Sequence, residues 1–195
     1  MYRTDFTPEI VLRAYSMGVF PMHHSDTGEI LWYRPDPRTI IPLDGFHLSH
    51  SLAKTIRSGR FEVKFNTDYI GVMRGCADRP EGTWISDEFY DVYGALFMAG
   101  FGGCVEVYYE GELAGGLYGL TIGGAFMAES MFHRVTDASK VAVAALVDRL
   151  NERGFELLDV QYLTSHLASL GAVEIPGSEY EKRLAAALRR RCRFA

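Results

Sequence analysis

The sequence predicts an α+β protein built on a mixed β-sheet that is flanked by helices. A β-rich stretch from Cys104 to Phe132 is interrupted by Glu110-Gly111 and Gly123-Gly124. Both are tight-turn pairs typical of an antiparallel meander. A long amphipathic helix is expected next, from Thr136 or Asp137 to Arg153. Strand, short helix, strand and final helix follow, and this order of elements is typical of a mixed sheet in an α+β domain.

The elements before the meander have clear end signals. Thr7-Pro8-Glu9 supplies an N-cap, a first-turn proline and an acidic first turn, so we expect a helix that ends near Gly18. Residues 18–38 are rich in Pro, Gly and aromatics and predict an ordered loop with one short strand at Ile30–Tyr33. Alternation and end signals then predict a strand at 61–65 and helices at Ser49–Ser58, 67–77 and Asp87–Ala99.

The elements after the long helix are shorter. A core strand begins at Leu157, a short helix spans Ser165–Leu170, and residues 172–175 form the last predicted strand. Ser178 and Glu181 have the spacing of a capping box, which predicts that the final helix starts at Ser178.

Composition and charge exclude several classes of function. The chain has 195 residues, of which 48% are hydrophobic and 23% charged, as in a globular protein. Its formal net charge of −5 argues against general polyanion binding, so nucleic-acid contact needs a local basic patch. Two runs are candidates, with solvated surface as the alternative for each: Arg189, Arg190, Arg191 and Arg193, and Lys54, Arg57, Arg60 and Lys64.

The three cysteines, Cys76, Cys104 and Cys192, are widely spaced and form no CxxC pair. This pattern argues against a disulfide framework and against zinc, and it fits a reducing compartment. No apolar run approaches membrane-spanning length, and the N-terminus has no signal-peptide pattern. We therefore expect a cytoplasmic protein without a metal site.

Two polar residues interrupt the apolar strand that begins at Leu157. Asp159 and Gln161 are two positions apart and therefore share one face of a strand. A buried carboxylate is costly unless it is paired or hydrogen-bonded. Either the two side chains satisfy a loop or helix end, or they face a pocket in which the carboxylate orients the amide.

Glu129 lies within the apolar run "FMAESMF" and needs a partner for the same reason. A structural ion pair with Arg134 or Lys140 is the alternative to a role in a pocket. A cluster of aromatics and prolines offers base-stacking surfaces: Trp32, Tyr33, Pro35, Pro37 and Trp84. The alternative is a core role, which is the more common one for a single tryptophan. Cys104 has no activating histidine nearby in sequence, which argues against a thiol nucleophile.

Six motifs in order resemble those of the bacterial leucyl/phenylalanyl-tRNA–protein transferases. They are "GVFPM", "LWYRPDPR", "GTWI", "GELAGGLYG", "AESMFHRVTDASK" and "DVQYLTSHLASLGAVEI", and they cover nearly the whole chain. The resemblance implies a small N-terminal subdomain over residues 1–36 and an acetyltransferase-like (GNAT-type) catalytic domain over 37–195, without coenzyme A or another cofactor. Family members commonly have Ala-His-Ser where this chain has Gly102-Gly103-Cys104, and an extra N-terminal segment before the position that corresponds to the first residue of this sequence.

By this resemblance, the protein is an aminoacyltransferase (EC 2.3.2.6). Nothing in the sequence demands more than a monomer, which is the state we expect. The protein would move leucine or phenylalanine from Leu-tRNA or Phe-tRNA to the α-amine of proteins that begin with Arg or Lys, and so mark them for degradation. Asp159, Gln161 and Glu129 would be the catalytic residues. The resemblance further implies a pocket for the amino-acid side chain, lined by Phe126, Met131, Leu117, Leu146 and Leu158. It also implies that the terminal adenosine of the tRNA is bordered by Trp84, Tyr15 and Met22.

Two other functions remain open at this stage. A coenzyme-A-dependent acyltransferase would use the same fold, but the glycines of "GLYGLTIGG" lie between strands rather than at a helix N-terminus, where a phosphate site would need them. A non-catalytic module that binds peptide N-termini would keep the acceptor site without the transfer reaction.

Overall fold

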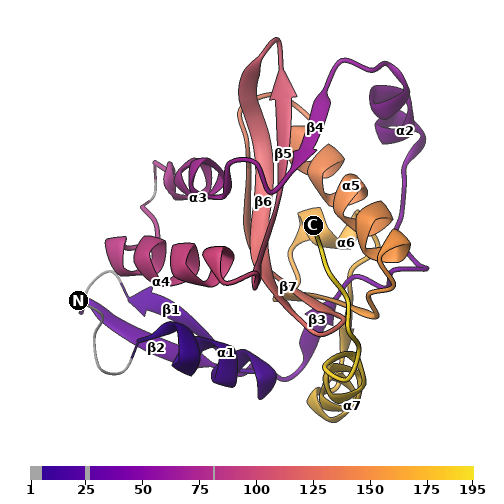
Figure 1. Ribbon diagram of the computed structural model, residues 1–195. Coiled ribbons are helices and arrows are strands. Elements are labelled where there is room, and N and C mark those ends of the chain that lie inside the picture. The colour runs from indigo at the N-terminus through magenta and orange to yellow at the C-terminus, as the bar shows by residue number, and fades with distance from the viewer. Residues whose placement is uncertain (1–5, 25–26, 81) are drawn as a thin grey trace.

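The computed structural model describes residues 6–24, 27–80 and 82–195. A seven-stranded mixed sheet forms the centre, and a two-stranded hairpin lies beside it (Figure 1). The elements in chain order are α1 (Pro8–Ser16), β1 (Phe20–His24), β2 (Glu29–Tyr33), β3 (Arg38–Ile40), α2 (His50–Arg57), β4 (Glu62–Phe65), α3 (Tyr69–Ala77), α4 (Asp87–Met98), β5 (Gly102–Tyr109), β6 (Glu112–Ile122), β7 (Ala125–His133), α5 (Ala138–Glu152), β8 (Leu157–Gln161), α6 (Ser165–Ala168), β9 (Val173–Ile175) and α7 (Gly177–Ala187).

The strands of the large sheet lie in the order β4-β5-β6-β7-β8-β3-β9. Strands β5, β6 and β7 form the predicted antiparallel meander. At its turns, Glu110, Gly111 and Gly123 have a positive φ. Among the described strands, only β7 and β8 pair in parallel, because α5 connects them as a crossover. The predicted α+β class and mixed sheet are therefore confirmed.

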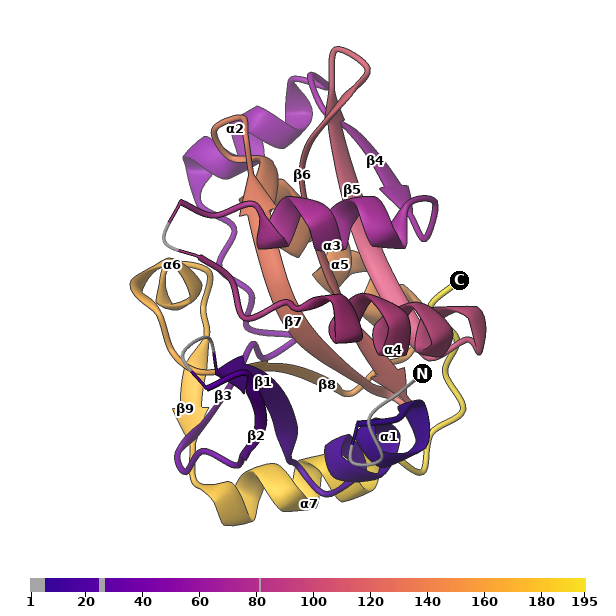
Figure 2. The same ribbon diagram turned by 90° about the vertical axis from the view of Figure 1, so that its left-hand side faces the viewer.

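The two faces of the sheet carry two separate cores. Helices α3 and α4 cover one face, and α5 with α2 covers the other (Figure 2). Helix α1 and the hairpin β1-β2 pack onto the same core as α3 and α4, and α7 joins that core from the C-terminal end of the chain. Segments from both ends of the sequence therefore meet near β8 and β3.

Two details of the prediction need correction. The segment 18–38 contains β1 and the start of β3 in addition to the expected strand near Ile30. The capping box is also wrong, because α7 begins at Gly177 and its first N–H donates to Asp36 (2.9 Å). Glu181 pairs with Arg34 instead of reaching back to Ser178.

Within the described ranges, none of the helices has the length and apolar character that crossing a membrane requires.

Candidate active site

An apolar pocket opens where the parallel strands β7 and β8 separate. Their pairing runs from Ala125 opposite Leu157 to Met127 opposite Asp159. The next four residues of β7, from Ala128 to Met131, line the pocket. It has a volume of about 80 Å³, which is enough for several water-sized groups. The lining residues are Ile41, Leu117, Ala128, Glu129, Ser130, Met131, Val143, Leu146, Leu158, Val160 and Leu167.

A β-bulge places Glu129 at the edge of this pocket. Tyr118 pairs with Ser130 and Gly119 pairs with Ala128, so Glu129 is the extra residue on β7. A bulge changes which face the following side chains occupy. As a result Phe126 and Met131, five positions apart, pack into the same core, while Glu129 points toward α1 and α4.

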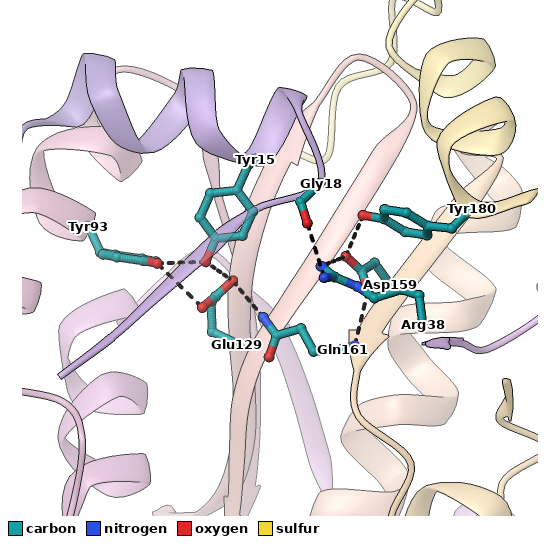
Figure 3. A network of polar contacts seen from close by, with 8 residues as sticks. All are labelled: Tyr15, Gly18, Arg38, Tyr93, Glu129, Asp159, Gln161 and Tyr180. Carbon is teal, nitrogen blue, oxygen red and sulfur yellow. Dashed lines mark hydrogen bonds and ion pairs between the residues drawn. The ribbon is translucent and has the colours of Figure 1, made fainter. Parts of the chain in front are cut away.

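Asp159 is fully buried and is saturated with hydrogen bonds (Figure 3). Arg38 donates from Nε to Oδ1 (2.8 Å) and from Nη2 to Oδ2 (2.6 Å), which makes a bidentate ion pair. Tyr180 donates its hydroxyl to Oδ2 (2.7 Å), and the backbone N–H of Gln161 donates to Oδ1 (3.0 Å). With four donors on its two oxygens, this carboxylate is held by partners within the protein.

Arg38 is equally constrained. Its guanidinium lies between the rings of Phe20 and Tyr180, at 4.8 and 4.7 Å from their centroids, and Nη1 donates to the carbonyl of Gly18 (3.1 Å). Burial alone would lower the pKa of Arg38, but the hydrogen bonds and the charge of Asp159 raise it above its ordinary value. Elements α7, β3, β8 and the end of α1 are thus joined at one ion pair.

Gln161 has a left-handed backbone conformation, with φ at 65°. The N–H of Tyr162 donates to the carbonyl of Val160 (2.8 Å), so Gln161 is the centre of a γ-turn, which is strained when φ is positive. The hydrogen bond from its own N–H to Asp159 holds this turn. Its side-chain Nε2 lies 3.4 Å from Oε1 of Glu129.

The expected relation between Asp159 and Gln161 is therefore wrong in one respect. The carboxylate orients the backbone of Gln161 rather than its side-chain amide, because the γ-turn directs that side chain away from Asp159 and toward Glu129.

Glu129 is almost completely buried, and its hydrogen-bond donors are all neutral. Tyr15 donates its hydroxyl to Oε1 (2.6 Å), and the hydroxyl of Tyr93 lies 3.4 Å from Oε2 and 2.7 Å from the hydroxyl of Tyr15. Burial and the nearby charge of Asp159 raise the pKa of Glu129 to about 8, against the opposing effect of the tyrosine hydrogen bonds. The alternative ion pairs are not formed, since Arg134 pairs with Asp78 and Lys140 pairs with Asp137.

The structure brings most of the expected pocket residues together. Leu117, Met131, Leu146 and Leu158 all line the pocket. Phe126 does not, which corrects the expectation for this residue. It precedes the point where β7 and β8 separate, and it is fully buried with its ring 5.3 Å from that of Phe194.

The residues expected to border the terminal adenosine lie in different settings. Tyr15 is 1% exposed and contacts Glu129 rather than an open surface, because α1 packs its ring into the core. Trp84 is half-buried, with its ring edge-on to Phe89 at 5.2 Å, and Met22 is half-buried on β1. Contact of Trp84 and Met22 with adenosine remains a prediction.

Three site residues were missed from the sequence. Arg38 is one residue of the motif "LWYRPDPR" with no local sign of a buried partner. Tyr93 and Tyr180 lie on helices, where a tyrosine is an ordinary core residue. The need of Asp159 and Glu129 for partners was the available signal, but it does not say which distant donors supply them. Cys104 is buried, donates to Glu106 (3.0 Å) and has its pKa raised by burial, so its thiol is no nucleophile.

Two family models match the chain. One, described as "Leucyl/phenylalanyl-tRNA protein transferase", covers residues 40–185, and one described as its N-terminal domain covers residues 4–36. The proteins named leucyl/phenylalanyl-tRNA–protein transferase from Gloeobacter violaceus and Ruegeria pomeroyi are 50% and 51% identical to the chain. These alignments cover 96% of this chain in both cases, and 97% and 90% of the relatives.

The fold, the pocket with its buried carboxylate, and these relatives define an enzyme of the aminoacyltransferase class. More particularly, the chain belongs to the leucyl/phenylalanyl-tRNA–protein transferase family.

Among solved structures, the chain is partly similar to an aminoglycoside acetyltransferase from an uncultured soil sample, with a TM-score of 0.43 and 13% identity over 56% of this chain and 83% of that one. A ribosomal-protein-alanine N-acetyltransferase from Brucella melitensis has a TM-score of 0.36 and 15% identity over 49% of this chain and 74% of that one.

Proposed function

We propose that this protein transfers leucine or phenylalanine from aminoacyl-tRNA to the N-terminal α-amine of proteins that begin with Arg or Lys, and that this marks those proteins for degradation. The observation that carries the proposal is the apolar pocket that ends at Glu129 beside Gln161. Such a pocket suits an aliphatic or aromatic side chain, and the names of the relatives agree with it.

The chemistry needs positioning more than activation. In the proposed reaction the α-amine nitrogen bonds to the ester carbonyl carbon, the bond from that carbon to the ribose oxygen breaks, and the ribose hydroxyl leaves with a proton from the amine. The ester is already activated, so the site has to hold the carbonyl, exclude water and place the amine.

Glu129 is suited to take the proton of the incoming α-ammonium group. An α-amino group has an ordinary pKa of about 7.7–8.0, and the pKa of Glu129 is raised to about 8. In its carboxylate form, Glu129 can take a proton from a group of similar pKa at small free-energy cost. Gln161 Oε1 would accept a hydrogen bond from the same amine while Nε2 stays directed at Glu129.

Asp159 has a positioning role in this proposal. Its oxygens are occupied by donors from Arg38, Tyr180 and the Gln161 backbone, which leaves it unsuited to accept a proton from substrate. It fixes the γ-turn that presents the Gln161 amide. We therefore assign proton transfer to Glu129 and hydrogen bonding of the amine to Gln161.

We also propose that the monomer is the active unit and that residues 1–36 act as a small subdomain that completes the site. The separate family match to residues 4–36 supports this division. The hydrogen bond from Tyr15 to Glu129 supports a direct contribution of that segment to the site.

The test is transfer of label from radiolabelled Leu-tRNA or Phe-tRNA to a protein with N-terminal Arg or Lys. The same protein with N-terminal Ala is the matched control. Label on the Arg and Lys proteins but not on the Ala protein supports the proposal. Equal label on all three contradicts the acceptor preference alone, and label on none contradicts the transfer function.

A further inference from the structure

Arg79 is an exposed cation fixed at the wall of the pocket. It lies two residues after the end of α3. Its Nη2 donates to Oγ of Ser130 (2.9 Å) and lies 3.4 Å from the carbonyl of Met131, and both of these residues line the pocket. The guanidinium is therefore one side chain away from the space that receives the amino acid.

The position of this guanidinium is well determined by its contacts. Nε donates to the carbonyl of Cys76 (3.0 Å), so hydrogen bonds to α3 on one side and to β7 on the other hold the group. Ordering an arginine side chain has an entropic cost, and here that cost is already met before any ligand arrives.

The charge of Arg79 is not neutralised by the residues that hold it. Its acceptors are a hydroxyl and two carbonyls, and no ion pair to Arg79 is found in the described part of the chain. The neighbouring Asp78 is directed to Arg134 (3.7 Å) instead. A guanidinium has five N–H groups, so Arg79 retains donors for a further acceptor.

The chemistry of the donor substrate supplies an anion at this place. The amino acid is esterified to the terminal ribose of the tRNA, and the nearest phosphate is one nucleoside away from the ester. Arginine binds phosphate with paired N–H donors, and phosphate contacts position a nucleic acid independently of its bases. The chain as a whole carries a net charge of −5, so such contacts must be local.

We propose that Arg79 binds a phosphate at the 3′ end of the aminoacyl-tRNA and so sets how deeply the ester enters the pocket. The inference depends on the proposed function, because it concerns the donor of that reaction. Arg79 belongs to neither of the basic runs noted in the sequence. One member of each run is paired with a carboxylate, Arg190 with Glu156 and Lys64 with Glu62.

The experiment compares two donors in the Arg79→Ala variant. Phenylalanyl-tRNA carries the phosphates, whereas 3′-O-phenylalanyl-adenosine carries none. We expect the variant to raise KM for phenylalanyl-tRNA about tenfold, as for loss of a charge-assisted hydrogen bond. The value of kcat/KM for phenylalanyl-adenosine should be nearly unchanged, and the slope of log kcat/KM against log salt concentration should fall by about 1 for the tRNA donor.

Arg74→Ala is the matched control, because Arg74 is an exposed arginine on α3 that contributes to the environment of Tyr90 rather than to the pocket. It should leave both donors unaffected. An equal loss with both donors in Arg79→Ala would mean that Arg79 only ties α3 to β7, and would overturn the inference. If the wild type transfers no label from phenylalanyl-tRNA, the proposed function itself fails, which is a separate outcome.

Discussion

Two carboxylates lie in the same site, and they differ in how their charge is compensated. Asp159 has a buried guanidinium as its counter-ion, whereas Glu129 has two tyrosine hydroxyls and one amide. Neutral donors offset less of the desolvation of a carboxylate than a cation does. This difference makes Asp159 the partner of a buried ion pair and leaves Glu129 as the carboxyl group whose pKa is raised.

Glu129→Gln tests this assignment through stability. The pKa of Glu129 is about 8 in the folded protein and near its ordinary 4.5 when unfolded, so folding favours the protonated form. That contribution is fully present below about pH 4.5 and is lost as pH rises through about 8. The Glu129→Gln variant has no ionisable group at this position, so it lacks this pH dependence. We expect the unfolding free energy of the wild type, relative to Glu129→Gln, to fall by roughly a few kcal/mol between pH 5 and 9.

Urea denaturation of both proteins at pH 5, 7 and 9 measures this difference. A difference that stays constant over the whole range would show that folding does not raise the pKa of Glu129, which contradicts the match to the pKa of an α-amino group on which its role in proton transfer is argued.

Arg38→Ala tests the buried ion pair. The change leaves the Asp159 carboxylate without its cation in a fully buried position, which costs about 3–5 kcal/mol of unfolding free energy. Arg34→Ala is the matched control, since Arg34 and Glu181 form an ion pair with side chains 55% and 53% exposed. Loss of an exposed pair costs about 0–1 kcal/mol. Chemical denaturation should separate the two variants, and equally small losses would contradict the importance of the buried pair.

At the scale of elements, two local irregularities build the site. The bulge on β7 turns Glu129 toward α1 and α4, and the γ-turn at the end of β8 turns Gln161 toward Glu129. Regular strands would have kept Gln161 on the same face as Asp159. The contact between Gln161 and Glu129 therefore depends on the bulge and the γ-turn, and not on the regular alternation of side chains along a strand.

The γ-turn leads to a prediction with paired variants. Gln161→Ala and Gln161→Gly both remove the amide, so we expect both to lower transfer to a similar extent. Glycine adopts positive φ without strain and alanine does not, so Gln161→Gly should be more stable than Gln161→Ala by about 1 kcal/mol. Thermal and chemical unfolding measure the difference. Greater stability of the alanine variant would mean that the turn is absent in solution.

At the scale of the whole molecule, the pocket is closed by parts that lie far apart in the sequence. Ile41 follows β3, Leu117 is on β6, Leu146 is on α5 and Leu167 is on α6. Both faces of the sheet take part, since the carboxylate network lies toward α1 and α4 and the apolar wall toward α5. Side-chain selectivity is therefore a property of the assembled fold.

Leu146→Ala and Leu150→Ala test this at matched positions of α5. Both leucines are buried, at 1% and 0% exposed, one turn apart, but only Leu146 lines the pocket. Each change should cost about 2–5 kcal/mol of stability. Only Leu146→Ala enlarges the pocket, so only it should raise the ratio of phenylalanine to leucine transfer, by about tenfold.

The measurement is a competition between differently labelled Leu-tRNA and Phe-tRNA for one acceptor. A shifted ratio in Leu150→Ala, or an unchanged ratio in Leu146→Ala, would show that this pocket does not receive the transferred side chain.

The sequence by itself determined which residues could not be ordinary core. Asp159, Gln161 and Glu129 stand out because a polar group in an apolar strand needs a partner, and that requirement is local. The meander and most helices also follow from local turn and cap signals. The capping box at Ser178 failed because a cap competes with tertiary partners, here Asp36 and Arg34.

Only the tertiary structure decided what each of these residues does. Arg38 lies 121 positions from Asp159, and Tyr15 lies 114 positions from Glu129, so no local pattern identifies either partner. The strand β3 is three residues long and is held by its neighbours β8 and β9 rather than by its own pattern. The partners of the buried charges and the shape of the pocket come from many segments that are far apart in the sequence, and these segments lie side by side only once the chain has folded.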